Sequence, residues 1–258
     1  MNHFLDEMNA CVNERVKTMS VDEQEPMVVP SFCELFYQST RPVIIAEIKF
    51  SSPSLGVIYH GDLSAVAIAR QYRQQGAHAI SIVTEPHFFK GTVQTVVDVH
   101  KQLPDCPLLF KDFILTPIQI KQAQRVGASA VLLIVGFLDE SQLRVLYEYA
   151  VSLGLTPLIE VHNAEELEVA LAMTPQMIGI NNRNLKTMTL DLHVSKTLIQ
   201  QVPDDVLVVC ESGMTCAKDI NAMRDLGCDG FLIGSHLMRS ANPGDALRKL
   251  LQGVVYAG

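Results

Sequence analysis

A carboxylate and an ammonium group lie two positions apart in this chain, at Glu47 and Lys49, directly after an apolar run that begins at Val43. Residues i and i+2 of a β-strand share one face, so both side chains would continue the face formed by Val43 and Ile45. Burying two opposite charges on such a strand costs desolvation free energy. The pattern therefore predicts either a site with a chemical function or a structural ion pair.

More polar side chains stand at the ends of later apolar runs, namely Lys111-Asp112, Glu160, Asn181-Asn182-Arg183 and Glu211-Ser212. A lone lysine or glutamate in such a place is more often solvated or salt-bridged than catalytic. If the runs are parallel strands of one barrel, their carboxyl ends meet at one opening, where clustered ionisable groups shift one another's pKa and suit acid and base catalysis. Because Lys111 stands between Phe110 and Phe113, we expect apolar surroundings that favour proton donation from it.

Two pairs of serine and glycine, Ser212-Gly213 and Gly234-Ser235, follow the last two apolar runs. Loops in these places of a barrel often bind phosphate through backbone N–H groups and the N-terminus of a short helix. Turn glycines are common, but the two pairs together predict a phosphorylated small molecule as the ligand. His162 and His236 fall near the same opening, and we expect each to be a supporting or loop residue rather than a base.

The elements that would position these residues follow from a repeat. Gly76, Gly127, Gly154 and Gly227 each end an amphipathic segment and precede an apolar run, as glycine does at the C′ position of a helix. Their spacings are close to multiples of about 25 to 30 residues, the size of one strand plus one helix. Plausible helix starts are Asp62-Leu63-Ser64, Thr116-Pro117, Asp139-Glu140-Ser141, Asn163 to Glu166, and Thr215.

Eight strands are predicted between these helices: Val43–Ile48, Ala79–Val83, Leu108–Lys111, Ala130–Val135, Pro157–Val161, Met177–Asn181, Val206–Cys210 and Gly230–Ile233. Their number and near-continuous apolar character favour an α/β fold, a closed (β/α)8 TIM barrel. An open doubly wound sheet is the alternative, but no GxGxxG motif follows the first strand. Residues 1–40 form an N-terminal helical extension, with Leu5, Met8 and Val12 at helical spacing and a second short helix capped by Ser31.

Size and composition limit the remaining possibilities. The chain has 258 residues, 48% of them hydrophobic, and we expect one barrel domain over residues 1–258. The formal net charge of −8, without a Lys/Arg cluster, opposes nucleic-acid and anionic membrane partners. Six scattered cysteines and eight histidines form no CxxC, HxH or HExxH motif, so we expect reduced thiols and no metal site. Neither a signal peptide nor a membrane span is predicted, which favours a cytoplasmic protein.

From about residue 4 to residue 252 the chain resembles the indole-3-glycerol phosphate synthase family. The resemblance rests on five motifs in order: Ala46-Glu47-Ile48-Lys49-x-x-Ser52-Pro53-Ser54-x-Gly56, Lys111-Asp112-Phe113-Ile114, Leu158-Ile159-Glu160-Val161-His162, Gly179-Ile180-Asn181-Asn182-Arg183-Asn184-Leu185, and Glu211-Ser212-Gly213 with Ile233-Gly234-Ser235. It implies closure of 1-(2-carboxyphenylamino)-1-deoxyribulose 5-phosphate to indole-3-glycerol phosphate in tryptophan biosynthesis, with loss of carbon dioxide and water. The resemblance implies no cofactor and no metal.

The resemblance also implies roles for individual residues. Lys111 matches the acid that protonates the ketone oxygen, and Glu160 matches the carboxylate that serves dehydration, assisted by Glu47 and Asn181. Lys49 and Arg183 match cations that hold the substrate carboxylate, and the division of acid roles between Lys49 and Lys111 stays open. The implied substrate-binding residues are Ser52, Pro53, Phe113, Arg183, Glu211, Ser212, Gly213, Gly234 and Ser235.

Some positions depart from the family pattern, and two other functions stay open. Relatives often carry a basic residue where Phe110 and Leu55 stand, and an Asp where Asn184 stands. One alternative is a noncatalytic paralogue that binds a phosphorylated metabolite. The other is a sibling barrel such as phosphoribosylanthranilate isomerase, for which a Cys would be expected where Glu47 stands. We expect a small phosphorylated substrate as partner, and a monomer or weak homodimer.

Overall fold

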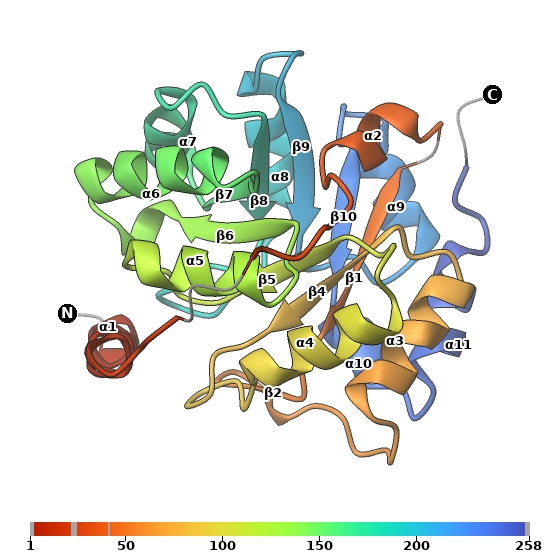
Figure 1. The fold of residues 1–258 in the computed structure, drawn as a ribbon. Helices are drawn as coiled ribbons and strands as arrows, with labels where there is room; N and C mark the ends of the chain where they lie inside the picture. The colour runs from red at the N-terminus through yellow and green to blue at the C-terminus, as the bar shows by residue number, and fades with distance from the viewer. Residues whose placement is uncertain (1–2, 22–24, 41, 256–258) are drawn as a thin grey trace.

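Eight parallel strands close into a barrel in the computed structural model, which describes residues 3–21, 25–40 and 42–255 (Figure 1). The strand order around the barrel is β1-β10-β9-β8-β7-β6-β5-β4, and β1 pairs with both β10 and β4. The closed (β/α)8 barrel is thereby confirmed and the open sheet excluded. The strands are β1 (Val43–Ile48), β4 (Ala79–Val83), β5 (Leu108–Lys111), β6 (Ala130–Ile134), β7 (Thr156–Val161), β8 (Met177–Asn181), β9 (Leu207–Glu211) and β10 (Gly230–Ile233).

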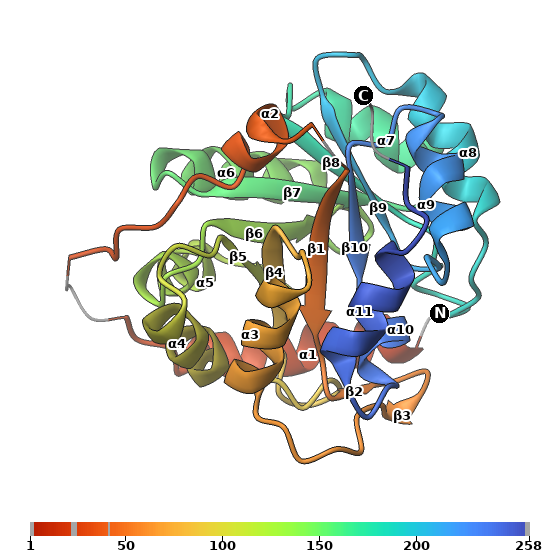
Figure 2. The same ribbon diagram turned by 90° about the vertical axis from the view of Figure 1, so that its right-hand side faces the viewer.

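Helices between the strands surround the barrel (Figure 2). They are α3 (Ala65–Gln74), α4 (Val93–Gln102), α5 (Pro117–Arg125), α6 (Glu140–Ser152), α7 (Ala164–Leu171), α8 (His193–Leu198), α9 (Ala217–Arg224), α10 (Ser235–Met238) and α11 (Pro243–Leu251), with 3-10 turns η1 (Val135–Phe137) and η2 (Ile199–Gln201). Four predicted helix starts are confirmed, because Ser64, Thr116, Asp139 and Asn163 are N-cap residues. The fifth N-cap is Cys216 rather than Thr215, whose hydroxyl instead donates to the Asp219 carboxylate.

Small shifts separate the predicted strands from the observed ones. β6 ends one residue early because Val135 begins a 3-10 turn, and β7 begins one residue early at Thr156. β9 is displaced by one residue, so that Glu211 ends the strand in register with Asn181 of β8. The four repeat glycines all have positive φ, between 76° and 107°, as their predicted C′ positions require.

The two faces of each strand belong to different parts of the core. On β1, Val43 and Ile45 belong to the apolar cluster inside the barrel, while Ile44, Ala46 and Ile48 pack with the surrounding helices. This division is the one that the alternation of the sequence predicted. It fixes the direction of Glu47, which continues the inward face.

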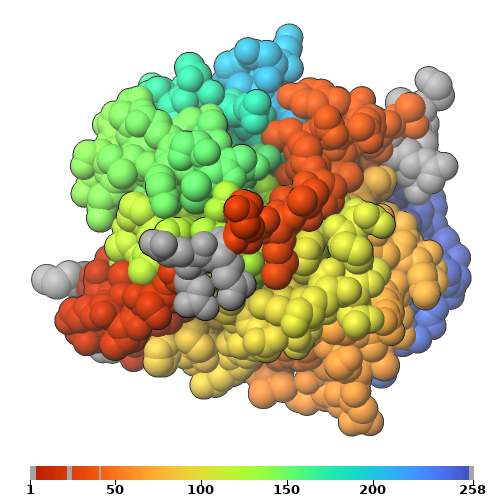
Figure 3. Space-filling model, viewed as in Figure 1, coloured from red at the N-terminus to blue at the C-terminus, as the bar shows by residue number. Residues whose placement is uncertain are grey.

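The N-terminal extension covers both ends of the barrel. Helix α1 (His3–Lys17) lies at the carboxyl ends of the strands, where Arg15 pairs with Asp112 at 2.7 Å, and α2 (Glu34–Gln38) lies at their amino ends (Figure 2). Residues of the connecting segment, orange-red in Figure 3, cross the outer surface of the barrel. The Ser31 hydroxyl accepts a hydrogen bond from Glu34 N, although the N-cap position is Cys33. Within the predicted extension, positions 1–2 and 22–24 lie outside the described residues.

A short hairpin of β2 (Ser51–Ser52) and β3 (Gly56–Val57) follows β1 at the carboxyl end of the barrel. The longest helix in the described ranges, α1, has 15 residues, so none of those helices could span a bilayer.

Candidate active site

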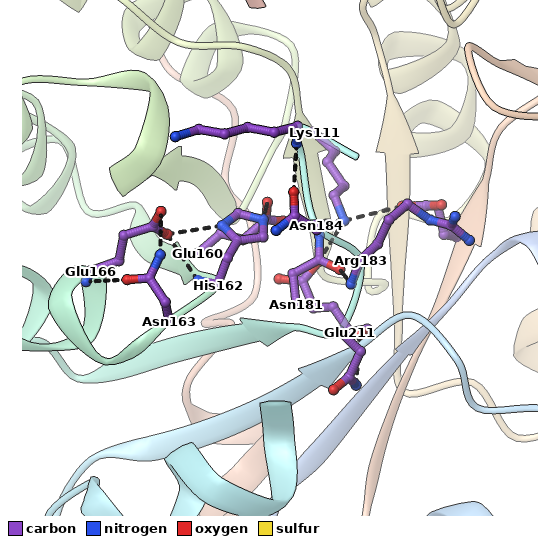
Figure 4. Close-up of polar contacts among 12 residues, drawn as sticks. Lys111, Glu160, His162, Asn163, Glu166, Asn181, Arg183, Asn184 and Glu211 are labelled. Atoms are coloured by element: carbon purple, nitrogen blue, oxygen red, sulfur yellow. Dashed lines mark hydrogen bonds and ion pairs between the residues drawn. The ribbon is translucent and has the colours of Figure 1, made fainter. Parts of the chain in front are cut away.

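A cleft opens at the carboxyl ends of the strands, and an adjoining hollow extends it toward α10. The predicted residues come together here. The cleft is lined by Glu47, Lys49, Ser52, Pro53, Lys111, Phe113, Glu160, Asn181, Arg183, Ser212 and Ser235, and Gly213 and Gly234 line the hollow. Glu211 contacts the cleft-lining Lys111 through its carboxylate. Side chains from β5, β7, β8 and β9 converge on this space (Figure 4).

Lys111 occupies the centre of the charged cluster. Its Nζ lies 2.6 Å from Glu211 Oε2, 3.3 Å from Glu47 Oε2 and 3.9 Å from Glu160 Oε2. Burial lowers the pKa of Lys111, but the three carboxylates outweigh it and raise the pKa above its ordinary value. Of the two phenylalanines expected near Lys111, Phe113 lines the cleft, but Phe110 points outward into the helix-facing core, and the groups nearest to Nζ are carboxylates.

The pair of Glu47 and Lys49 is both a structural ion pair and part of the cleft. Lys49 Nζ lies 2.5 Å from Glu47 Oε1, and the carboxylate is nearly fully buried. Burial raises the pKa of Glu47, but Lys49 and Lys111 outweigh it and the net pKa is lowered. Glu47 is therefore a fixed negative charge between two lysines that face the cleft.

Glu160 and Glu211 are two buried carboxylates with opposite pKa shifts. For Glu160, burial is outweighed by the contact with His162 and the charge of Lys111, which lower the pKa to about 2. For Glu211, burial dominates, and the nearby Glu160 charge adds to it, so that the pKa rises to about 8 despite Lys111. Two interacting groups whose pKa values are pushed apart suit one role as base and one as proton holder.

His162 links Glu160 to Glu166 on α7 (Figure 4). Its Nε2 lies 3.2 Å from Glu160 Oε1 and its Nδ1 lies 2.9 Å from Glu166 Oε2. Burial lowers the pKa of His162, but its contacts with the two carboxylates raise it to about 10. The sequence predicted only a loop or supporting residue here, although the spacing of His162 and Glu166 at i and i+4 was a usable signal.

The loop after β8 fixes Arg183 at the cleft. Asn181 Oδ1 accepts a hydrogen bond of 3.0 Å from Arg183 N, and Arg183 Nη1 donates to Met188 O at 2.9 Å. Asn184, a departure from the family pattern, closes the loop because its Oδ1 accepts from Lys186 N and Thr187 N. The guanidinium is held facing the cleft, where it can bind an anion.

The adjoining hollow has the features predicted for a phosphate site. Ser212 and Gly213 have φ of 63° and 89°, so the backbone turns sharply after β9. A Cβ atom on Gly234 would overlap Glu47 Oε1, which explains the glycine there. Sequence reasoning missed Arg239, which lines the hollow one helical turn after Ser235 and brings a second guanidinium near Arg183. A basic residue four positions after the serine was the signal available.

An apolar wall also lines the cleft, and of its residues the sequence predicted Phe113 but missed the others. It is formed by Phe4, Phe89, Phe113, Leu132, Ile134 and Leu185. Phe4 comes from α1 and contacts Phe88 edge to face, with 5.3 Å between ring centroids. A flat apolar ring fits such a wall. The cleft can thus hold a molecule that is apolar at one end and anionic at the other.

A metal ion would need a cluster of side chains that can ligate it. Over residues 3–21, 25–40 and 42–255, no group of three or more His, Cys, Asp and Glu side chains has a suitable arrangement. The three carboxylates nearest one another, those of Glu47, Glu160 and Glu211, already surround the Lys111 ammonium. What this arrangement can do is protonate, deprotonate and bind anions.

The comparisons with known proteins agree with this geometry. A family model described as indole-3-glycerol phosphate synthase matches residues 1–250. A protein of that name from Aliarcobacter butzleri is 43% identical, covering 85% of this chain and 84% of its own, and one from Shouchella clausii is 40% identical, covering 95% and 96%. The solved structure of 3-hexulose-6-phosphate synthase from Salmonella typhimurium shares the fold, with a TM-score of 0.66, 13% identity and coverage of 82% and 98%.

Proposed function

Since the chain belongs to the indole-3-glycerol phosphate synthase family, we propose that Lys111 is the proton donor in its ring closure and Glu160 the base in its dehydration step. The enzyme is a carbon-carbon lyase of tryptophan biosynthesis. It converts 1-(2-carboxyphenylamino)-1-deoxyribulose 5-phosphate to indole-3-glycerol phosphate, releasing carbon dioxide and water. The proposal rests above all on one observation, the Lys111 ammonium surrounded by three buried carboxylates inside the cleft.

The first step needs a proton at the ketone oxygen. The aromatic carbon that bears the carboxylate attacks the ketone carbon, and the carbonyl electron pair takes the proton from Lys111 Nζ. Loss of carbon dioxide then restores the aromatic ring. Because Lys111 is charged in the free enzyme, its proton is in place when the substrate arrives, and displacement of a carboxylate partner by substrate would ease its release.

The second step removes water. The hydroxyl group leaves as water with a proton from a lysine ammonium group, for which we propose Lys49 because Lys111 has given up its proton in the first step, and the proton on the adjacent ring carbon goes to a base. Glu160 supports the role of base because its pKa is lowered, so it is ionised at neutral pH. Glu47 and Asn181 assist by holding Lys111 and the loop of Arg183 in place.

Binding of the substrate divides between the two parts of the cleft. We assign the substrate carboxylate to Lys49 and Arg183, and the aromatic ring to the wall that contains Phe113. The phosphate belongs in the hollow with Gly213, Gly234 and Ser235, where backbone N–H groups and Arg239 are available. Ser52, Pro53, Ser212 and Glu211 complete the set of proposed contacts.

The alternatives kept open by the sequence lose their support. A noncatalytic paralogue would not need a buried lysine and a base on different strands. The sibling isomerase is disfavoured because Glu47, in its ion pair with Lys49, occupies the place where a cysteine was expected. We further propose a single domain over residues 1–258 and a monomer or weak homodimer in the cytoplasm. The six free cysteines and the net charge of −8 support that setting and give no support to nucleic-acid or membrane partners.

A direct assay tests the activity. Purified protein is mixed with 1-(2-carboxyphenylamino)-1-deoxyribulose 5-phosphate, and indole fluorescence is followed with time. We expect turnover that is saturable in substrate and competitively inhibited by inorganic phosphate. Folded protein that gives no indole signal would overturn the proposed function.

A further inference from the structure

We propose that His162 is a positioning residue of the reaction, an imidazolium clamped by Glu166 that holds Glu160 ionised and in orientation. The inference deepens the proposed function, since it rests on Glu160 as the base. The sequence predicts His162 to be a supporting or loop residue, and neither step of the reaction uses it. Its place in the fold nevertheless connects a buried base to a helix outside the barrel.

The geometry divides the two oxygens of Glu160 between two cations. Oε1 lies 3.2 Å from His162 Nε2, an ion-pair contact without hydrogen-bond geometry, and Oε2 lies 3.9 Å from Lys111 Nζ, which also lines the cleft. The His162 side chain is only 6% exposed and that of Glu160 only 2%. One oxygen is thus anchored from behind, while the other is left for the substrate.

Glu166 fixes the imidazole on its other side. Glu166 Oε2 accepts hydrogen bonds from His162 N, at 2.9 Å, and from His162 Nδ1, at 2.9 Å. Asn163, the N-cap of α7, donates to Glu166 Oε1 and accepts from Glu166 N, so the carboxylate itself is oriented. Gly136 of η1 leaves room for it, because a Cβ atom there would lie 2.9 Å from Glu166 Oε1.

An imidazole between two carboxylates must carry two protons to satisfy both. A neutral imidazole has one N–H donor, so its other nitrogen would turn a lone pair toward a carboxylate. The groups that face the His162–Glu160 pair are Glu166 from α7, Lys111 from β5, Asn181 from β8 and Glu211 from β9. The raised pKa of His162 agrees with an imidazolium at neutral pH.

Glu211 provides an internal comparison. Both Glu160 and Glu211 are buried against Lys111, but only Glu160 has a second cation behind it. The pKa of Glu160 is lowered and that of Glu211 is raised, so His162 decides which carboxylate of the pair carries the negative charge. The base of the reaction is thereby assigned by a residue that does not touch the substrate.

The test is the pH dependence of kcat in two variants. His162→Gln keeps an N–H donor near Glu160 but removes the charge, and Glu166→Gln keeps the shape but removes the carboxylate that stabilises the imidazolium. Loss of the cation raises the pKa of Glu160, so less base is ionised at low pH. For His162→Gln we expect the acid limb of the pH profile of kcat to move up by about one pH unit, so that the ratio of kcat at pH 8 to kcat at a pH on that limb rises about tenfold above wild type. Glu166→Gln should shift the ratio in the same direction by less, with KM within about threefold.

Controls distinguish the effect of the His162 charge from that of the Glu160 base. His193→Gln, at an exposed histidine on α8, should leave the ratio unchanged. In the wild-type enzyme, ¹⁵N NMR should show a doubly protonated imidazole at pH 7.5, identified as the signal lost in His162→Gln. A neutral His162, or variants with the wild-type ratio, would overturn the inference. Undiminished turnover by Glu160→Gln would instead overturn the role of Glu160 as base, while the NMR result would still report on His162 by itself.

Discussion

The two ends of the barrel differ in their side chains, which are apolar at the amino ends of the strands and charged at the carboxyl ends. At the amino ends of the strands, Phe32, just before α2, and Phe36, within it, belong to the interior apolar cluster, and Phe36 packs over Gly230. At the carboxyl ends, the same interior ends in charged side chains, such as the partly buried Lys111 and the buried Glu211. Burial of apolar surface stabilises the fold, whereas burial of charges costs desolvation free energy that pairing only partly offsets. The amino end of this barrel therefore contributes mainly to stability, and the carboxyl end holds the groups that do the chemistry.

The N-terminal extension serves both ends. Helix α1 joins the chemical end through the Arg15–Asp112 pair and the Phe4–Phe88 contact, and Phe4 lines the cleft. Asp112 is held further by a hydrogen bond from the Thr84 hydroxyl, directly beside Lys111. The helix therefore contributes to the site wall, while α2 closes the floor of the barrel.

The largest expected effect comes from removing the central cation. Lys111→Ala should reduce kcat by about 10²- to 10⁴-fold, the usual contribution of a general acid, while substrate binding stays measurable. Steady-state kinetics with fluorescence detection would measure the loss. Lys101→Ala, at an exposed lysine on α4, is the matched control and should retain wild-type kcat. Wild-type turnover in Lys111→Ala would contradict the role of Lys111.

At the amino end of the barrel, Phe36→Ala should lower the stability of the protein and leave its activity nearly unchanged. Removing the buried ring should lower the free energy of unfolding by about 3 kcal/mol, measured by urea denaturation, because it leaves a cavity. The folded fraction should keep kcat within about twofold of wild type. Tyr37→Ala, at the exposed neighbour, should cost little stability. A Phe36→Ala protein that is stable but inactive would contradict the assignment of stability to the amino end and of chemistry to the carboxyl end.

Gly234→Ala probes the phosphate hollow at the border of the chemical end. The added Cβ would overlap Glu47 Oε1, so either Glu47 or the backbone near the phosphate must move. We expect KM to rise about tenfold or more, equivalent to about 1.4 kcal/mol, and competitive inhibition by inorganic phosphate to weaken in parallel. An unchanged KM would show that the phosphate lies elsewhere.

A smaller effect is expected in the pH dependence of stability. The pKa of His162 is raised from 6.5 to about 10, so the folded state holds this proton more tightly than the unfolded state. The stability it contributes is complete below pH 6.5 and is lost as the pH rises toward 10. Urea denaturation between pH 7 and 9.5 should show a downward slope, and His162→Gln should remove up to about 1.36 kcal/mol per pH unit of it. Equal slopes in the two proteins would contradict an imidazolium at His162.

The comparison also shows what the sequence could predict. Strand positions and the cluster of Glu47, Lys111 and Glu160 were predictable, because alternation and strand ends are local patterns that a barrel converts into one opening. Phe4 in the cleft wall was not, because it depends on where α1 packs. The raised pKa of Lys111 was also missed, since Phe110 points outward while carboxylates from three other strands surround the ammonium group.

In the proposed reaction Lys111 acts by giving up a proton and not by its charge alone. Lys111→Arg separates the two, because a guanidinium keeps the positive charge but does not release a proton at these pH values. The measurement is kcat together with the substrate Kd, obtained by titration under single-turnover conditions. For Lys111→Arg we expect a Kd within about tenfold of wild type and a kcat reduced by about 10²-fold or more. An arginine variant that binds substrate and turns it over at the wild-type rate would contradict the claim.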